Sequence, residues 1–358
     1  MTTSLPEHFP PSPQADDEIV NRLGLSADEL RLAKEVHVQG TEHLLERLRE
    51  RAVELTDKQR ELSSAVAAEL DATLRAYGIG MPDRPAPEVI AFEQADFLES
   101  TGRTETAQQR TGGIFIPALH TIVLRYLKKA WSNDARNETF VHTLAHESVH
   151  AAGIRRMQTI LTSKGDAAIE THRSGLHIFA LDNPEHSRFS DLDEAVTEML
   201  AITVSNRVIR ARPEQFRTTM VSQIAHYLRH APDHAPWRTL AVRMGWRPTD
   251  SDERTSAIAE RLLDEKKFPY SVGRERFRSY VKQRRVLKKI MDEIGRRNPN
   301  NYGTPSDVEA LFYRAMIGGT MLELGRVVEK TFGAGTFRLM AEDYFGKDLQ
   351  ERLESGRP

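Results

Sequence analysis

The five residues from His146 to His150 constrain this chain more than any other segment, because they read His-Glu-Ser-Val-His. On a helix, residues four positions apart lie one turn above each other on the same face. Two imidazoles at this spacing can bind one Zn²⁺, and the intervening Glu147 can reach water bound to the same ion. The pattern fixes only three positions, so the residues around it decide whether it is a metal site.

The residues that flank this motif predict an amphipathic helix. Helix-capping residue types occur in residues 133–137, and Glu138 places negative charge in a first turn. An apolar or small face with a three-four spacing follows, made of Phe140, Val141, Leu144, Ala145, Ser148, Val149 and Ala152. His146 and His150 fall on the other side of the predicted helix. The apolar face would therefore pack in a core, while the histidine face would line a cleft.

A third ligand is needed, since a catalytic zinc site usually has three protein ligands and one position for water. His142 continues the histidine row one turn earlier, but an ordinary polar residue near a helix start is the simpler interpretation. Gly153 extends the motif to the start of the metzincin signature. The third histidine of that signature would fall at Arg156, which excludes a metzincin site.

A second helix is predicted over residues 190–201. Ser190 and Asp191 are capping types, and an apolar stripe follows, made of Leu192, Val196, Met199, Leu200 and Thr203. Glu194 and Glu198 lie one turn apart on another face of this helix. Two unrelated acids on a solvated face are the alternative interpretation. The upstream motif disfavours that alternative, because each half of the pattern predicts the other.

The upstream motif and the later Asp-Glu-Ala-Val-Thr-Glu together resemble the gluzincin metallopeptidases, the thermolysin-like clan in the broad sense. The resemblance implies that His146, His150 and Glu194 bind a catalytic Zn²⁺. It implies that Glu147 acts as general base and then acid, and that Glu198 orients the first histidine. The gap between the two motifs is longer than in compact clan members and must hold an extra loop or strand. Alternative third ligands in that gap are His172, His177, His186, Asp191 and Asp193.

Two short apolar runs precede the motif helix, at residues 112–117 and 121–124, and predict a β-hairpin. In gluzincin-like proteins, a Gly-x-aromatic strand and a following Ile-x-Leu strand often stand directly before this helix. An edge strand in that place can bind an extended peptide through main-chain hydrogen bonds. An ordinary core hairpin is the alternative, and it is compatible with this interpretation.

The tetrahedral intermediate of peptide hydrolysis needs an oxyanion donor besides the metal. In the resembled family this donor is often a Tyr or His from the downstream lobe. Tyr270, in the run Phe-Pro-Tyr-Ser, is the first candidate in this chain. The rivals are Tyr302, Tyr313, His177 and His186. For each tyrosine, a buried side chain with an ordinary hydrogen bond is the competing interpretation.

Composition limits the cofactor and the partners. The chain has no cysteine, so disulfides and thiolate zinc sites are excluded and His and carboxylate must bind the metal. Its 50 Lys and Arg against 52 acids leave a net charge of −2, with no general attraction to nucleic acid or anionic membrane. There is no run of membrane-span length and no signal-peptide core. We expect a peptide or protein substrate, no nucleic-acid partner and a cytoplasmic location; the oligomeric state is not indicated.

We predict an α+β, mainly helical fold for the 358 residues. Its parts are a disordered tail (1–16), an N-terminal helical region (17–80), a catalytic lobe with a small antiparallel or mixed sheet (81–212) and a helical C-terminal lobe (213–358). A capping box at residues 26–29 begins the first helix. Further strands are predicted at residues 89–92 and 175–181.

Residues 274–297 are locally basic and are predicted to form a helix. The cations are Arg276, Arg278, Lys282, Arg284, Arg285, Lys288 and Lys289, and the core face is Leu287, Ile290, Met291 and Ile294. A solvated face is the preferred interpretation, and contact with nucleic acid or a membrane is the alternative.

These patterns together predict a zinc-dependent metallopeptidase that hydrolyses peptide bonds with a metal-activated water and with Glu147 as general base and acid. The alternative is a regulatory or binding protein that retains a metallopeptidase-like fold with narrow or no proteolytic activity. The intact Glu147 argues against that alternative. A structural helical protein with a chance motif is the third hypothesis, and it predicts that no metal binds.

Overall fold

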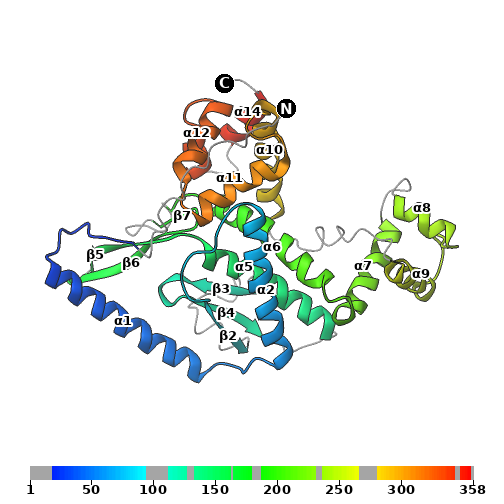
Figure 1. Ribbon diagram of the computed structural model, residues 1–358, viewed down its shortest axis with the longest axis horizontal. Coiled ribbons are helices and arrows are strands. Elements are labelled where there is room, and N and C mark those ends of the chain that lie inside the picture. Colours follow the sequence, from blue (N-terminus) through cyan, green and yellow to red (C-terminus); the bar gives the residue numbers. More distant parts are fainter. Residues whose placement is uncertain are drawn as a thin grey trace, which may run out of the picture.

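A computed structural model of the protein describes residues 18–93, 112–126, 133–162, 164–179, 187–230, 236–265, 280–342 and 347–355. Helices predominate, and two small sheets of four and three strands complete the fold (Figure 1). The predicted α+β, mainly helical class is therefore confirmed. The predicted tail, residues 1–16, lies outside the described residues.

The N-terminal region contains two long helices, α1 (Ala27–Glu50) and α2 (Asp57–Ala76). Helix α1 starts at the predicted capping box, in which the Ser26 amide donates to the Glu29 carboxylate at 2.8 Å and the Glu29 amide donates to Ser26 Oγ at 3.4 Å. Helix α2 buries the stripe Leu62, Val66, Leu70 and Leu74 in the main core. A short strand that the sequence did not predict, β1 (Glu18–Val20), precedes both helices.

The three-stranded sheet has the order β2 (Glu88–Glu93), β4 (Thr121–Tyr126), β3 (Gly113–Ile116). Strands β3 and β4 form the predicted hairpin, in which Gly113 pairs with Leu124, and the short 3₁₀ turn η1 (Pro117–Leu119) connects them. Strand β2 pairs in parallel with β4 and confirms the strand predicted at residues 89–92. Among the described residues β3 has only one strand neighbour, so no strand pairs with its outer edge.

The four-stranded sheet has the order β1, β5 (Arg155–Leu161), β6 (Ala167–Ser174), β7 (His177–Ile178). Its antiparallel pair β5–β6 occupies most of the long gap between the two predicted metal helices. The sequence indicated only one strand in that gap, at residues 175–181. Strand β7 lies within that range and is two residues long, and residues 180–181 lie outside the described part. The hairpin was missed because its polar and charged residues fall on both faces.

The two predicted motif helices are α5 (Asn133–Ala152) and α6 (Ser190–Arg210), which pack side by side in the centre of the molecule (Figure 1). The expectation that Ser190 and Asp191 cap α6 is wrong at the N-cap position. Phe189 occupies it with a left-handed backbone (φ 60°) and without a side-chain cap. Burial of the Phe189 ring and donation of its amide to the Ala341 carbonyl at 3.1 Å hold this conformation.

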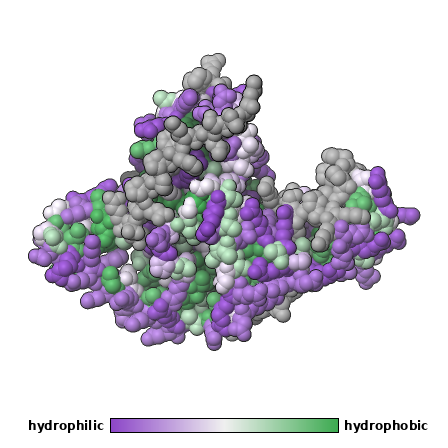
Figure 2. Space-filling model, in the orientation of Figure 1, coloured by the Kyte–Doolittle hydropathy of each residue, from purple (hydrophilic) through white to green (hydrophobic). Residues whose placement is uncertain are grey.

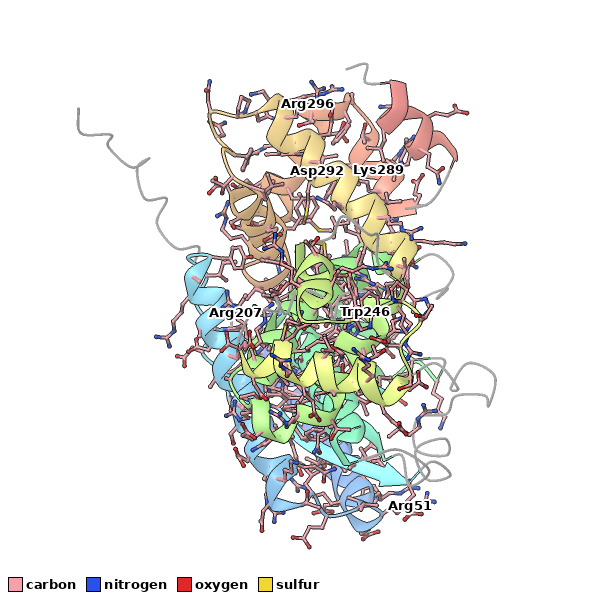
Figure 3. The ribbon with its side chains drawn as sticks, turned by 90° about the vertical axis from the view of Figure 1, so that its right-hand side faces the viewer. Arg51, Arg207, Trp246, Lys289, Asp292 and Arg296 are labelled. Atoms are coloured by element: carbon pink, nitrogen blue, oxygen red, sulfur yellow. The ribbon has the colours of Figure 1, made fainter. Side chains whose placement is uncertain are left out.

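Every regular element that the structure describes after Arg212 is helical. A 3₁₀ turn, η3 (Pro213–Gln215), is followed by α7 (Arg217–His230), α8 (Pro236–Arg243), α9 (Asp252–Asp264), α10 (Val281–Arg297), α11 (Pro305–Ile317), α12 (Met321–Phe332), α13 (Thr336–Glu342) and α14 (Lys347–Ser355). Helices α10 to α14 share one continuous core with α2, α5 and α6. Helices α7 to α9 form a projecting arm (Figure 1), and their separate core surrounds Trp246, which is labelled in Figure 3.

The outer edges of the face drawn in Figure 2 are mainly hydrophilic, and apolar residues are visible mostly toward its middle. Within the described ranges, no helix combines the length and the apolar character needed to cross a bilayer. The predicted cytoplasmic location stays a prediction.

Candidate metal centre

The α5–α6 pair brings three potential ligand atoms together from two helices. His146 Nε2 lies 3.2 Å from His150 Nε2 and 3.2 Å from Glu194 Oε2, while His150 Nε2 lies 3.6 Å from Glu194 Oε2. The two histidines come from successive turns of α5, and Glu194 comes from the second turn of α6. Within the described part of the chain, these three residues form the group whose ligand atoms converge closely enough to hold a metal ion.

The spacing of these atoms can be compared with that of a zinc site. In a tetrahedral site with metal–ligand bonds of about 2.0–2.1 Å, neighbouring ligand atoms are about 3.3 Å apart. The three distances of 3.2, 3.2 and 3.6 Å are close to that value. Two imidazoles and one carboxylate also form a donor set that Zn²⁺ accepts. The residues therefore fit a metal ion without rearrangement of the helices.

Glu198 supports the first histidine from the next turn of α6. Its Oε2 lies 3.0 Å from His146 Nδ1, and its side chain is fully buried, which contradicts the alternative of a solvated acid. Its other oxygen lies 3.3 Å from His142 Nε2. His142 in turn places Nδ1 3.3 Å from the Ser205 hydroxyl. His142 is thus a partner of Glu198 and not a member of the convergent group.

Asp193 supports the second histidine in the same way. Its Oδ2 lies 3.2 Å from His150 Nδ1, and its Oδ1 accepts a 2.7 Å hydrogen bond from the Leu176 amide. Gly175 allows this contact, because a Cβ atom there would lie 2.4 Å from Asp193 Oδ1 and the backbone has a φ of 60°. The sequence named Asp193 only as a rival ligand. The sequence signal for its role as a partner of His150 is its position directly before the predicted ligand Glu194.

The other rival ligands lie outside the convergent group. Asp191 Oδ1 accepts a 3.3 Å hydrogen bond from Gln283 on α10. His172 lies on β6 and His177 on β7, and burial lowers the pKa of both imidazoles. His186 lies outside the described residues.

Mutual charge–charge contacts hold the ligand groups in place. Burial alone would lower the pKa of His146, but hydrogen bonds that the imidazole donates to the Glu194 and Glu198 carboxylates outweigh it and raise this pKa to about 10. Burial would raise the pKa of Glu198, but contacts with His142 and His146 bring it down to about 2. The carboxylates therefore favour positive charge at the place where the ligand atoms meet, which a divalent cation would supply.

Glu147 lies between the two histidines in sequence and is buried against the hairpin. Burial raises the pKa of its carboxyl group, and the Phe115 amide of β3 donates a hydrogen bond to it. The outer edge of β3 therefore faces the centre. This approach requires glycine at position 113, where a Cβ atom would lie 2.8 Å from Thr143 Cγ2 and 3.1 Å from Glu147 Cγ.

A tyrosine that the sequence did not single out, Tyr280, contacts the centre at His146 and Glu194. Its ring stacks on His146 with centroids 5.8 Å apart and an interplanar angle of 8°. Burial raises the pKa of Tyr280, and its hydroxyl donates a hydrogen bond to Glu194. It caps the start of α10 with a left-handed backbone (φ 52°). No local pattern in the sequence marks such a backbone at a tyrosine.

The tyrosines that the sequence proposed have other positions. Tyr270 lies outside the described residues. Tyr313 is buried in the core and makes an edge-to-face contact with Tyr77. This position agrees with the alternative that it is a structural tyrosine. Tyr302 packs against the same core.

A scan against protein-family models and searches of curated proteins and of solved structures found no match to this chain.

Proposed function

We propose that this protein is a zinc-dependent hydrolase of peptide bonds, with its active site at the α5–α6 centre. The observation that carries the proposal is the convergence of His146, His150 and Glu194 at 3.2–3.6 Å beside the buried carboxyl group of Glu147. Two nitrogen ligands, one oxygen ligand and an adjacent base are the parts that metal-assisted hydrolysis needs.

The two imidazole Nε2 atoms and Glu194 Oε2 would hold the ion, and Glu198 and Asp193 would orient the imidazoles. A bound Zn²⁺ would supply a water of lowered pKa and would polarise the substrate carbonyl. Glu147 takes a proton from the attacking water and passes it to the nitrogen of the leaving amine as the C–N bond breaks. The products are a carboxylic acid and an amine, and Glu147 returns to its starting protonation state.

Two further groups are placed to act on the substrate. The outer edge of β3 can pair with an extended peptide by main-chain hydrogen bonds. The Tyr280 hydroxyl stays protonated because its pKa is raised, so it can donate to the developing oxyanion. Tyr280 is thus a further candidate donor, and Tyr270, outside the described residues, stays a prediction.

The test is metal content, measured by mass spectrometry on the purified protein and on Glu194→Ala. We expect about one zinc per chain, lost in the variant. A peptide library is then incubated with the wild type and with Glu147→Gln. We expect cleavage by the wild type only, with Glu147→Gln retaining the metal and losing about 10²–10⁴-fold in rate.

Two results would contradict the proposal. The first is a wild type that takes up no metal after zinc loading, which would leave the convergent residues as a buried ion-pair network. The second is equal cleavage by Glu147→Gln, which would point to a contaminating peptidase. Circular dichroism of each variant shows whether it is folded.

A regulatory or binding protein with narrow or no proteolytic activity is the second candidate function. The observation that favours it is the α7–α9 arm, whose core is separate from the main core and which projects from the body of the molecule (Figure 1). A projecting module of this kind suits recognition of one partner. This candidate predicts a zinc-loaded protein that leaves a general peptide library intact.

A further inference from the structure

The exposed face of α10 has an unbalanced positive charge. Of its first nine residues, five are Lys or Arg and none is acidic: Lys282, Arg284, Arg285, Lys288 and Lys289. Cations in a first helical turn are unfavourable with the helix dipole, and α10 has no acidic residue in its first turn and no side-chain cap to offset them. By contrast, α1, α9 and α11 each begin with acidic residues and a capping side chain.

Three of these cations form the α10 cationic stripe, defined as Lys282, Arg285 and Lys289. They are spaced three and four residues apart, so they share one face of the helix, opposite the buried Leu287 and Ile290. All three side chains are exposed. None of the ion pairs between described residues involves them.

The second half of α10 differs from the stripe, because acids there balance the cations. Asp292 accepts from Lys288 at 3.0 Å, and Glu293 bonds both Arg296 and Arg297. Figure 3 shows Lys289, Asp292 and Arg296 along this helix, so the change from unpaired to paired charge occurs within one element. A solvated helix face usually intersperses both signs, as this second half does.

The stripe begins at the candidate active site. Lys282 is two residues after Tyr280, whose ring stacks on His146. Gln283, between the stripe residues, reaches Asp191 on the first turn of α6. The exposed cations that follow Tyr280 and Gln283 along α10 are therefore the stripe residues.

We propose that the α10 cationic stripe binds an acidic segment of the peptide substrate, on one side of the bond that is cleaved. The proposal rests on the proposed hydrolase function. Seven residues of helix span about 10 Å, and an extended peptide covers the same length in about three residues. The stripe runs from about 3 to about 14 Å beyond Tyr280 along the helix, so Asp or Glu side chains fall about one to four residues from the cleaved bond.

The first experiment measures binding without catalysis. The probe is a fluorescein-labelled peptide with six consecutive glutamates, and its counterpart carries six glutamines. Both are titrated into the full-length, zinc-loaded Glu147→Gln protein with and without the added changes Lys282→Gln, Arg285→Gln and Lys289→Gln. We expect the stripe variant to bind the acidic peptide at least about tenfold more weakly, and added salt to reduce this difference.

A matched control removes three exposed arginines that have acidic partners, with Arg31→Gln, Arg60→Gln and Arg75→Gln. The change in net charge is the same as in the stripe variant. Equal weakening in both variants would overturn the proposal, because it would show an effect of net charge alone. Tighter stripe-dependent binding of single-stranded DNA or anionic vesicles would also overturn it.

The second experiment uses the active protein and compares a cleaved library peptide with its Glu-to-Gln counterpart. The ratio of their kcat/KM values should fall at least about tenfold in the stripe variant and stay constant in the control. If acidic binding depends on the stripe but no peptide is cleaved, the proposed hydrolase fails while the stripe stands as an acidic-peptide site. If peptides are cleaved without a preference for acids, the stripe proposal fails alone.

Discussion

Two helices of this protein carry a pair of histidines at the same spacing, and only one pair belongs to a candidate site. On α5, the His146 and His150 rings have centroids 4.9 Å apart. On α7, the His226 and His230 rings have centroids 4.4 Å apart. Both helices therefore have histidines four residues apart, so this spacing does not distinguish the two pairs.

The difference lies in what faces each pair. The α5 pair meets Asp193, Glu194 and Glu198 from α6, and its imidazoles are largely buried. The α7 pair is exposed on the arm, and the intervening Arg229 forms an ion pair with Asp252. Two histidines one turn apart are thus not enough for a metal centre. A second element must also place carboxylates within contact distance of the imidazole nitrogens.

The largest expected effect is on metal binding and tests the comparison directly. The double variant His146→Ala/His150→Ala removes two of the three converging ligand atoms, whereas His226→Ala/His230→Ala removes a pair outside the convergent group. We expect the first to lose more than about 100-fold in zinc affinity, which exceeds the upper end of outer-shell effects, and the second to bind like the wild type. Competition titration with a chromophoric chelator measures both. A zinc loss in the α7 variant would break the comparison.

The next effect concerns Tyr280; within the described ranges, no tyrosine ring is stacked on the α7 pair. Tyr280→Phe keeps the ring that stacks on His146 and removes the hydroxyl that contacts Glu194. We expect kcat to fall about 10²–10³-fold, as for loss of one oxyanion donor, with the zinc content unchanged. Steady-state kinetics on one cleaved peptide give the result. A rise in KM at unchanged kcat would instead make Tyr280 a substrate-binding residue.

A smaller effect is expected for the carboxylates behind the histidines. Asp193→Asn and Glu198→Gln keep the shape of each side chain but weaken its hold on His150 and His146. We expect each to lower zinc affinity by about 10–100-fold. Asp191→Asn is the matched control, because Asp191 lies on the same helix and contacts Gln283 and neither histidine. If Asp193→Asn binds zinc as tightly as the wild type, the negative charge of Asp193 is not needed to orient His150, and the proposed role of this carboxylate fails.

Sequence patterns predicted the parts of this centre that are local. The helix with His146 and His150, the start of α1 and the β3–β4 hairpin follow from spacing and capping within a few residues, and the structure contains all three. The approach of Glu194 to the histidines depends on the packing of α6 on α5, for which the resemblance to a known motif supplied the expectation.

What the sequence did not predict depends on contacts between distant segments. The role of Asp193 needs the Leu176 amide from the loop after β6, and the position of Tyr280 needs a left-handed backbone at the start of α10. The β5–β6 hairpin is stabilised by pairing with β1, more than 130 residues earlier. None of these contacts leaves a periodic signal in the chain.

The smallest expected effect is for Glu293, and it compares the ion pairs of Glu293 on α10 with the buried contacts of Glu198 at the metal centre. Hydrogen bonds from Arg296 and Arg297 lower the pKa of Glu293 to about 2. The pKa of Glu198 is also about 2, because its contacts with His142 and His146 outweigh the effect of burial. Glu293 lies in the second half of α10, where its partly exposed side chain pairs with Arg296 and Arg297 and not with a residue of the metal centre. Because its pKa is lowered on folding, its contribution to stability is present above the unfolded value near 4.5 and is lost as the pH falls through about 2.

Glu293→Gln should therefore reduce the free energy of unfolding at neutral pH by less than about 1 kcal/mol, since solvent screens the pair. The difference from wild type should shrink below pH 4.5 and vanish near pH 2, as measured by urea denaturation across this range. Zinc content and peptide cleavage should not change. A loss of zinc in Glu293→Gln would show that the C-terminal helices control the centre through α10, and the distinction between the two charge clusters would then fail.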